Sequence, residues 1–424
     1  MTERRVTSEA ARRRIRRRYQ AERRFRAYGA VAIGAALLAL VLLLVSVAVR
    51  ALPAFWQHEV RLAVHFAAAL LDPEERGAAA LPQANYAALV KQALRDRFPE
   101  ATGRAELRAL SALLSVEAPF ELRQRVLAEP SLVGRTEEVV LLLSDEADLY
   151  LQGRLEDGPA AGMSALQMAS LDALRDEGRI ERVFASRFLR SGDSREPELA
   201  GVWGAAVGSF WTLVVTLVLS FPIGAAAALY LEEFAPRSRF TDWIEVNINN
   251  LAAVPSIVFG LLGLALFLNV FGLPRSAPLV GGMVLALMTL PTVIIAARSA
   301  IRAVPPSIRE AALGVGASPL QVALQHVLPL ALPGVLTGTI IGMARALGET
   351  APLLMIGMVA FIVDVPSGVM DPATVLPVQI FLWADAPERA FLAKTSAAIL
   401  VLLGFLVTMN LAAVLLRNRF ERRW

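Results

Sequence analysis

The stretch from Ser307 to Gly357 reads SIREAALGVGASPLQVALQHVLPLALPGVLTGTIIGMARALGETAPLLMIG. Its first half is polar and broken by glycine and proline, whereas its second half is apolar over the ~20 residues that a membrane-spanning helix needs. Arg345 and Glu349 lie inside this apolar half. Because a charge within a bilayer is energetically expensive, the pair indicates a functional position in a membrane protein.

The composition of the whole chain also places it in a membrane. Hydrophobic residues make up 56% of the 424 residues, and the mean hydropathy of +0.53 exceeds that of soluble domains. The absence of cysteine excludes disulfides, cysteine zinc sites and thiol catalysis. The sequence has no GxxxxGK(S/T) loop, and neither Lys91 nor Lys394, its two lysines, follows a glycine. Any ATP hydrolysis must therefore come from another polypeptide.

Residues 1–27 form a basic arm that is crowded with arginine, although the net charge of the chain is only +4. Such an arm can bind nucleic acid or anionic lipid. Because it directly precedes the apolar residues 28–49, we interpret it as a cytoplasmic topology signal beside membrane lipids, with no nucleic acid as partner. Ser46 and Ala48 resemble a cleavage site, but the length of the span favours an uncleaved anchor.

Six apolar stretches reach, or come close to, the ~20 residues that cross a bilayer. They are Ala27–Val49, Val202–Leu231, Leu251–Leu273, Leu279–Ala297, Leu332–Ile362 and Ser396–Leu416. If the N-terminus is cytoplasmic, the inside receives the arm, Arg237, Arg239, Arg302, Arg309 and the C-terminal arginines, and the short outside loops hold only Arg275, Arg389 and Lys394. This is the distribution that the positive-inside rule predicts, so we expect both termini and the loop with Glu310 in the cytoplasm.

Residues 50–200 lie between the first two spans and contain no membrane-length apolar run. Their number is enough for one folded domain, which this topology makes extracytoplasmic. Apolar spacing predicts helices at Tyr86–Arg97 and Arg104–Leu114, and alternation predicts short strands at Val139–Leu143 and Asp148–Gln152. We therefore expect an α+β or mostly helical domain. We expect no metal site, because Leu62 stands where an HExxH motif beginning at His58 needs its second histidine.

Arg345 and Glu349 are four residues apart, which places them on one face of a continuous helix, with Arg345 near the midpoint of the apolar run. Two interpretations remain open. The pair is either a buried ion pair that fixes helix packing, or part of an anion path in which the arginine fork attracts an oxyanion and Glu349 weakens its hold. Two interpretations also remain open for Arg298. It is either a second cation on the anion path, or a residue whose side chain extends (snorkels) to the membrane surface.

The loop at residues 304–330 carries the stronger signal. Pro305 and Pro306 end one helix, and Ser307 with Glu310 predicts a capping box for the next, which Gly316 and Pro319 then break. Glu310-Ala311-Ala312, followed by Gly316 and later by Leu328-Pro329, resembles the EAA loop of ABC importer permeases. In that family the loop forms a coupling helix that docks on the cytoplasmic ATPase. His326 departs from the family pattern, which usually has isoleucine there.

Three further motifs narrow the resemblance to PstA-type phosphate permeases. They are Asn249–Leu261 (NNLAAVPSIVFGL), Ala344–Leu353 (ARALGETAPL) and Leu376–Ile380 (LPVQI). The resemblance covers about half the chain, from Trp203 to Trp424. The family often has an arginine soon after the Leu-Pro of the fourth span, but here Ile295 stands at that distance and Arg298 comes one turn later.

The resemblance implies an α-helical integral membrane protein of the bacterial inner membrane. Residues 201–424, with the first span, would form the six-helix permease fold of type I ABC importers, paired with a PstC-type permease subunit, two PstB-type ATPase subunits and a periplasmic phosphate-binding protein. ATP and magnesium would bind the ATPase, so this subunit would need no cofactor and catalyse no reaction. We expect Arg345, Glu349, Thr350 and Arg298 on the path of inorganic phosphate, although Arg298 does not occupy the family's arginine position. We expect Glu310, Ala311, Ala312 and Gly316 in the coupling to the ATPase.

Two other functions compete with phosphate import. A permease for another oxyanion, such as molybdate or sulfate, would use the same coupling loop. A membrane-anchored sensor or scaffold would instead be built around residues 50–200, but such a protein needs neither a coupling loop nor a charged pair within the membrane.

Overall fold

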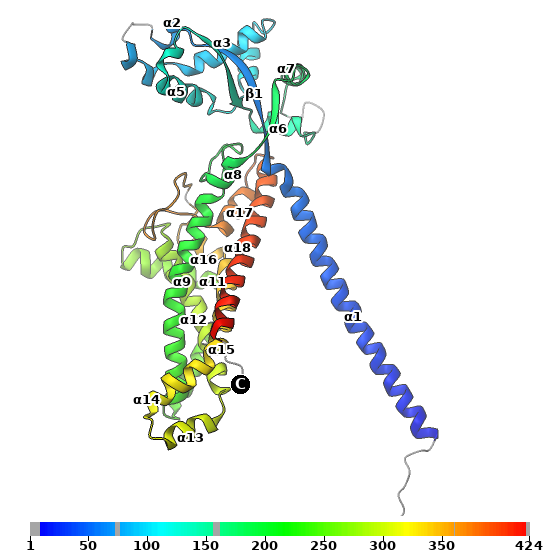
Figure 1. Cartoon of the computed structure of the whole chain (residues 1–424), viewed down its shortest axis with the longest axis vertical. Coiled ribbons are helices and arrows are strands. Elements are labelled where there is room, and N and C mark those ends of the chain that lie inside the picture. Colours follow the sequence, from blue (N-terminus) through cyan, green and yellow to red (C-terminus); the bar gives the residue numbers. More distant parts are fainter. Residues whose placement is uncertain (1–8, 73–76, 156–161, 360, 421–424) are drawn as a thin grey trace, which may run out of the picture. The chain divides into compact units, whose positions relative to one another are not determined.

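The computed structural model describes residues 9–72, 77–155, 162–359 and 361–420. The chain separates into two compact units, Met1–Arg50 and Ala51–Trp424. The first unit is nearly all of one helix, α1 (Glu9–Ala51), whose 43 residues correspond to about 65 Å at ~1.5 Å per residue (Figure 1). This helix runs without a break from the arginine-rich arm into the first apolar span. No residue of its most apolar window is buried, as a lipid-facing helix requires.

The interhelical domain, residues 52–190, is α+β. A short helical turn, η1 (Leu52–Phe55), leads into a three-stranded antiparallel sheet of order β2-β1-β3, made of β1 (Trp56–His65), β2 (Thr136–Leu142) and β3 (Ile180–Phe184). Val60, Leu62 and Val64 of the central strand are buried on one face and alternate with more exposed residues. The helices of the domain are α2 (Ala68–Leu71), α3 (Tyr86–Arg97), α4 (Arg104–Ser111), α5 (Ala118–Ala128), α6 (Asp145–Leu151), α7 (Ala165–Asp176) and α8 (Ser186–Arg190).

The helix predicted at Tyr86–Arg97 is confirmed, and the second predicted helix ends at Ser111, earlier than expected. The strand predicted at Asp148–Gln152 is wrong, because this segment belongs to helix α6. Ser144 caps α6 by accepting a hydrogen bond from the Ala147 amide, and acidic residues fill its first turn. Both features stabilise a helix start and outweigh the weak alternation of apolar residues.

The second unit continues into a bundle of long apolar helices. They are α9 (Trp203–Leu229), α12 (Pro278–Arg302), α15 (Leu328–Leu347) and α18 (Phe391–Phe420), together with a pair formed by α10 (Arg239–Ala252) and α11 (Ser256–Gly263), which η7 (Leu264–Val270) extends. The pair is bent by 100° before Ser256, where Pro255 keeps the preceding residue out of helical geometry. By length and composition, the described residues contain five possible spans, or six if the bent pair counts as one. The predicted helical membrane fold is thereby confirmed.

Close helix packing in this bundle depends on small residues. A side chain on Gly282 of α12 would meet Cβ of Val215 in α9 at 2.4 Å, and one on Gly338 of α15 would meet Cβ of Ala296 in α12 at 2.1 Å. Such glycines let two backbones approach each other, which is the main source of helix attraction where lipid removes the hydrophobic effect. Helix α12 is therefore held between α9 and α15.

The fifth span differs from its prediction. Helix α15 ends at Leu347, and Gly348 to Thr350 separate it from the short helix α16 (Ala351–Met355). The expectation of one helix with Arg345 at its midpoint is therefore wrong, since Arg345 lies in the last turn. Gly348 at the C-cap and Pro352 in the first turn of α16 explain the break, because glycine favours helix ends and proline favours helix starts.

Candidate functional site

The predicted coupling loop forms helix α13 (Pro306–Gly314), a short turn α14 (Pro319–Gln321), and η8 (Val322–Val327), which continues into α15. Helices α13 and α14 lie at one end of the bundle, and α8 and α17 (Leu376–Ala384) lie at the other end (Figure 1). The capping box predicted from Ser307 and Glu310 is wrong, because Pro305 occupies the N-cap and α13 begins at Pro306. The predicted break is confirmed, since α13 ends at Gly314 and Gly316 has a φ of +92°.

The four residues predicted to couple to the ATPase differ in their exposure. Glu310, Ala311 and Gly316 are exposed, whereas Ala312 is buried in an apolar cluster with residues of α12 and η8. The helix thus presents Glu310 to a partner and packs Ala312 against the bundle. His326, the departure from the family pattern, is exposed in η8, where it does not disturb this packing.

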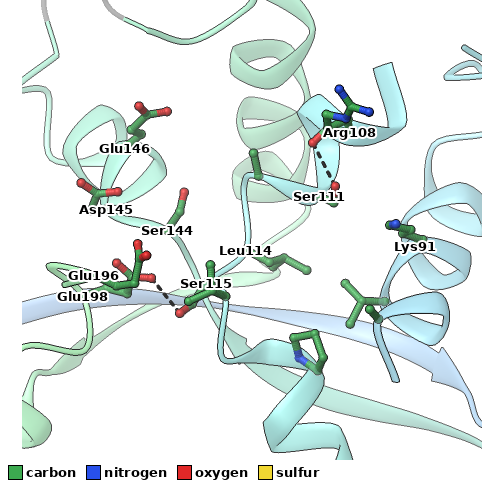
Figure 2. A pocket seen from close by; sticks show the side chains of 15 residues that line it. Lys91, Arg108, Ser111, Leu114, Ser115, Ser144, Asp145, Glu146, Glu196 and Glu198 are labelled. Atoms are coloured by element: carbon green, nitrogen blue, oxygen red, sulfur yellow. Dashed lines mark hydrogen bonds between the residues drawn. The ribbon is translucent and has the colours of Figure 1, made fainter. Parts of the chain in front are cut away.

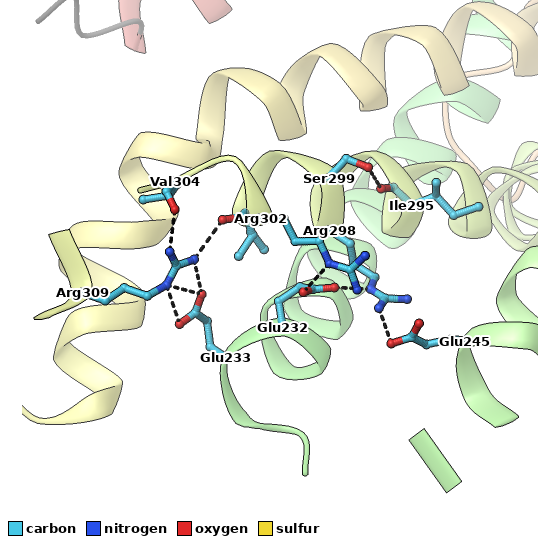
Figure 3. A network of polar contacts seen from close by, with 10 residues as sticks. Glu232, Glu233, Glu245, Ile295, Arg298, Ser299, Arg302, Val304 and Arg309 are labelled. Carbon is cyan, nitrogen blue, oxygen red and sulfur yellow. Dashed lines mark hydrogen bonds and ion pairs between the residues drawn. The ribbon is translucent and has the colours of Figure 1, made fainter. Parts of the chain in front are cut away.

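An arginine beside Glu310 fixes α13 to the bundle. Arg309 donates from Nη2 to Oε1 of Glu233 at 2.7 Å and from Nε to both carboxylate oxygens of Glu233 at 3.1 and 3.3 Å. It also donates from Nη1 to the Val304 carbonyl at 2.6 Å and from Nη2 to the Ile301 carbonyl at 2.9 Å (Figure 3). Ile301 lies in the last turn of α12, and Val304 follows two residues after the end of that helix. One guanidinium group therefore joins α13, the end of α12, and the end of α9.

Two further arginines extend this contact. Arg298, which is 8% exposed, donates from Nε to Oε1 of Glu232 at 2.6 Å and from Nη2 to Glu245 of α10. Arg302 donates from Nε to Oε2 of the same Glu232 at 2.8 Å (Figure 3). We call this set the anchor network; its members are Glu232, Glu233, Glu245, Arg298, Arg302 and Arg309.

The elements that carry the anchor network explain why it forms. Glu232 and Glu233 lie on η6 (Tyr230–Phe234), a wide helical turn that ends α9 and points adjacent carboxylates toward α12 and α13. Arg298 and Arg302 are four residues apart on α12 and share one helical face. Buried charges of this kind are tolerated only when they are paired and hydrogen-bonded. Arg298 is buried and paired with two carboxylates, those of Glu232 and Glu245.

The sequence motifs missed most of the anchor network. Arg309 and the three glutamates are absent from the predicted site, and only Arg298 was singled out. One signal was present: two adjacent glutamates end the second span, and arginines end the fourth span on the same predicted side of the membrane. Opposite charges at neighbouring helix ends favour pairing, but the sequence does not say which helices are neighbours.

Arg345, Glu349 and Thr350, the other predicted site residues, lie together at the break between α15 and α16. Nε of Arg345 is 3.5 Å from Oε1 of Glu349, and the two side chains are 54% and 19% exposed. Thr350 is the N-cap of α16, and its carbonyl accepts hydrogen bonds from the Leu353 and Leu354 amides. The pair forms although Glu349 lies beyond the helix end, and it leaves the arginine fork half-exposed. Such a fork can bind an oxyanion through two N–H groups.

The described residues contain no cluster of three histidines and carboxylates that could hold a metal ion. Oδ1 of Asp148 lies 2.6 Å from Nδ1 of His58 and also accepts a hydrogen bond from the His58 amide, which ties β1 to α6. His65 instead contacts the Thr136 hydroxyl across the sheet at 3.0 Å. These histidines therefore take part in packing of the interhelical domain.

Comparison with known families divides the chain in two. Residues 220–424 match the family described as "Binding-protein-dependent transport system inner membrane component", and residues 12–159 match "Domain of unknown function (DUF3333)". The chain is 34% identical over 225 residues to the phosphate transport system permease protein PstA 1 of Mycobacterium tuberculosis, which covers 53% of this chain and 72% of that protein.

Other relatives include the probable ABC transporter permease protein YqgI of Bacillus subtilis, 29% identical over 54% of this chain and 81% of that protein. The phosphate transport system permease protein PstC of Pasteurella multocida is 28% identical over 62% of this chain and 87% of its own length. Among solved structures, an inward-facing MetNI methionine ABC transporter matches 52% of this chain and 98% of that chain, with 17% identity and a TM-score of 0.42.

Proposed function

We propose that this chain, which belongs to the PstA family of ABC importer permease subunits, is a membrane subunit of an ATP-driven phosphate importer. The observation that carries the proposal is the 34% identity to a PstA protein over 225 residues. The chain is a multi-pass membrane protein and a transport subunit, and we propose that a partner ATPase binds ATP and magnesium and hydrolyses the ATP.

The proposed coupling step begins at α13. Exposed Glu310 and Ala311 would contact the ATPase, while buried Ala312 keeps the inner face of the helix against the bundle. A displacement of α13 would reach α12 through the Arg309 contacts with the Ile301 and Val304 carbonyls, and α9 through Glu233. We assign Arg298 to this network, because both of its carboxylate partners would have to leave before it could bind an anion.

The proposed substrate path includes Arg345, Glu349 and Thr350. A half-exposed guanidinium at a helix break can donate two hydrogen bonds to a phosphate ion. Glu349, at 3.5 Å, already neutralises part of this charge, so phosphate binding would be weak enough to permit release. The Thr350 hydroxyl would add one further donor beside them.

The proposed assembly contains a PstC-type permease subunit, two PstB-type ATPases and a periplasmic phosphate-binding protein in a bacterial inner membrane. Both termini and α13 would face the cytoplasm, as the distribution of arginine favours. The interhelical domain would then lie outside, on the side from which the binding protein delivers phosphate. Exposed apolar side chains of α1 and α18, including Leu42 and Val407, would contact lipid or the second permease.

Co-purification tests this proposal. The tagged chain is purified from the native membrane, its partners are identified, and ATP turnover is measured with binding protein that carries phosphate, sulfate or molybdate. The proposal predicts an ATPase and a second permease in the preparation, with turnover stimulated by the phosphate-loaded protein alone. Stimulation by the sulfate- or molybdate-loaded protein would identify that oxyanion as the transported substrate. Purification without an ATPase would contradict the transport function.

A further inference from the structure

The interhelical domain is joined to the bundle by residues 191–202, which we call the connecting loop. Its two ends are bonded to each other, since the Gly201 amide donates to the Gly192 carbonyl at 2.8 Å and the Trp203 amide donates to the Ser191 carbonyl at 3.1 Å. A side chain on Gly192 would lie 1.9 Å from the Val363 carbonyl oxygen, so the loop packs closely on a second segment. The loop is therefore a fixed structure and not a flexible tether.

The connecting loop makes polar contacts with three separate parts of the second unit. Asp193 accepts a hydrogen bond from Nε1 of Trp383 in α17 at 3.0 Å. The Ala200 carbonyl accepts one from Nζ of Lys394 in α18 at 2.8 Å. Glu198 accepts one from the Ser115 hydroxyl of the interhelical domain at 2.7 Å (Figure 2). The loop thus bonds to both α17 and α18 and to the domain.

Apolar packing strengthens the same junction. Phe188 of α8 lies 6.4 Å from the Trp383 ring, which stacks on Phe391 of α18 at 5.6 Å. Phe188, Ala200, Trp383 and Phe391 belong to one buried cluster, which contains residues of the domain, the loop and the bundle. Arg187, next to Phe188, forms ion pairs with Glu117 and Glu121 within the domain. A shared core of this kind makes its parts move together.

Buried charged residues interact across the junction between the loop, α18 and the domain. Lys394, Asp193 and Glu198 are each only 9% exposed. The ammonium group of Lys394 lies over the Phe188 ring at 5.7 Å, and the carboxylates that attract it are Glu198, Asp148, Asp145 and Asp193. Burial raises the pKa of the Asp193 and Glu198 carboxyls, and the nearby charge of Lys394 opposes this rise at Asp193. Lys394 therefore connects the first turn of α18 to charges on both the loop and the domain.

We propose that the connecting loop is a positioning element for transport and that Lys394 of α18 is the positioning residue that holds this loop. The loop makes the interhelical domain move as one body with α17 and the start of α18. The proposal rests on the transport function above and gives a role to the domain of unknown function. Any displacement of these two helices during the transport cycle must carry the domain with it or break the Lys394–Ala200 bond. The domain then stabilises one arrangement of α17 and α18.

The test compares Lys394→Met with Lys91→Met in the assembled transporter. Lys91 is the only other lysine and is exposed on α3, so it is a matched control. Phosphate uptake is measured per assembled complex, at increasing concentrations of loaded binding protein. We expect Lys394→Met to lower maximal uptake about tenfold, the effect of losing one buried charged hydrogen bond, with an unchanged apparent KM. Equal maximal uptake per complex in the two variants would overturn the proposal.

Two additions keep the test decisive. If Lys394→Met does not assemble, Asp193→Asn replaces it, because the amide keeps the shape and can accept from Trp383 but loses the charge that faces Lys394. Hydrogen exchange of residues 191–202 is read in the same samples and does not depend on the transported anion. We expect exchange about tenfold faster in Lys394→Met or Asp193→Asn and unchanged in Lys91→Met. Unchanged exchange in the junction variants refutes the positioning role even if the wild type imports a different anion.

Discussion

Arg309 and Glu233 form a bidentate ion pair, in which Nη2 lies 2.7 Å from Oε1. This pair ties α13, the helix of the EAA motif, to the end of α9. The same guanidinium also donates to the Ile301 carbonyl in the last turn of α12 and to the Val304 carbonyl just beyond it. The contact therefore joins the surface proposed to meet the ATPase to the two helices that pack most closely within the bundle.

Replacement of Arg309 by lysine tests this connection. Lysine keeps the charge but lacks the planar fork, so it cannot bond both oxygens of Glu233 and two carbonyls at once. We expect ATP turnover to continue while phosphate uptake per ATP hydrolysed falls about tenfold, the effect of losing ~1.4 kcal/mol of coupling. Exposed Arg237 supplies the control as Arg237→Lys. An unchanged uptake-to-ATP ratio in Arg309→Lys would exclude this pair from coupling.

Arg298 and Arg302 share Glu232 but differ in burial, which predicts different effects on stability. The Arg298 side chain is 10% exposed, so Arg298→Met leaves Glu232 without its buried partner and weakens Glu245 as well. We expect a loss of about 3–5 kcal/mol, the usual cost of removing one member of a buried pair. Arg302 is 62% exposed, and Arg302→Met should cost about 0–1 kcal/mol. Thermal unfolding of the purified protein measures both; equal losses would contradict the assignment.

Arg345→Ala tests the proposed anion path. The variant should enter the membrane and assemble normally, because the side chain is half-exposed and its removal leaves only Glu349 without its partner. Phosphate uptake should fall below detection, since the fork that attracts the anion is gone. Immunodetection of the assembled complex is the control for expression. Normal uptake by the assembled variant would leave Arg345 with a packing role only.

Asp145, at the start of α6, predicts a pH dependence for the interhelical domain. Burial, followed by the charges of Glu146, Glu196 and Glu388, raises the pKa of this carboxyl from 3.8 to about 6. The folded pKa lies above the unfolded one, so the unfolded chain loses its proton first as pH rises. The stabilisation from the protonated group is full below pH 3.8 and is lost as pH rises through about 6.

Asp145→Asn should remove this dependence and stabilise the domain at neutral pH by an amount on the order of 1 kcal/mol, after allowance for partial solvent screening. Hydrogen exchange of α6 and the β-sheet, measured between pH 5 and pH 7.5 and corrected for intrinsic exchange, is the readout. Exposed Glu137→Gln is the control. A variant that is less protected than the wild type at neutral pH would refute the predicted sign.

The parts of the fold that the sequence predicted are those that depend on local pattern. The bounds of α3 follow from Asn85, which caps the helix by accepting from the Ala88 amide, and from regular apolar spacing. The long apolar helices follow from hydropathy in the same way. Helix α6 was missed because a serine cap decided the structure of a segment too short for a reliable periodicity.

The site was less predictable because it depends on which helices are neighbours. Glu233 and Arg309 are 76 residues apart, and no local pattern pairs them. Hydropathy alone does not predict the break after Leu347, because the apolar run continues through Gly348 and Pro352, the residues that end α15 and start α16. Family motifs identified Arg345 and Glu310 as important but gave no information on the connecting loop, which lies outside those motifs.

The most direct test of the central claim is ATP-driven uptake of radiolabelled phosphate by liposomes that contain this chain with its co-purified permease and ATPase partners. We predict uptake that requires ATP and the loaded binding protein, that unlabelled phosphate abolishes, and that excess sulfate and molybdate leave unchanged. Uptake that is insensitive to unlabelled phosphate, or the absence of ATP-dependent uptake in a complete complex, would contradict the assignment of this chain as a phosphate permease subunit.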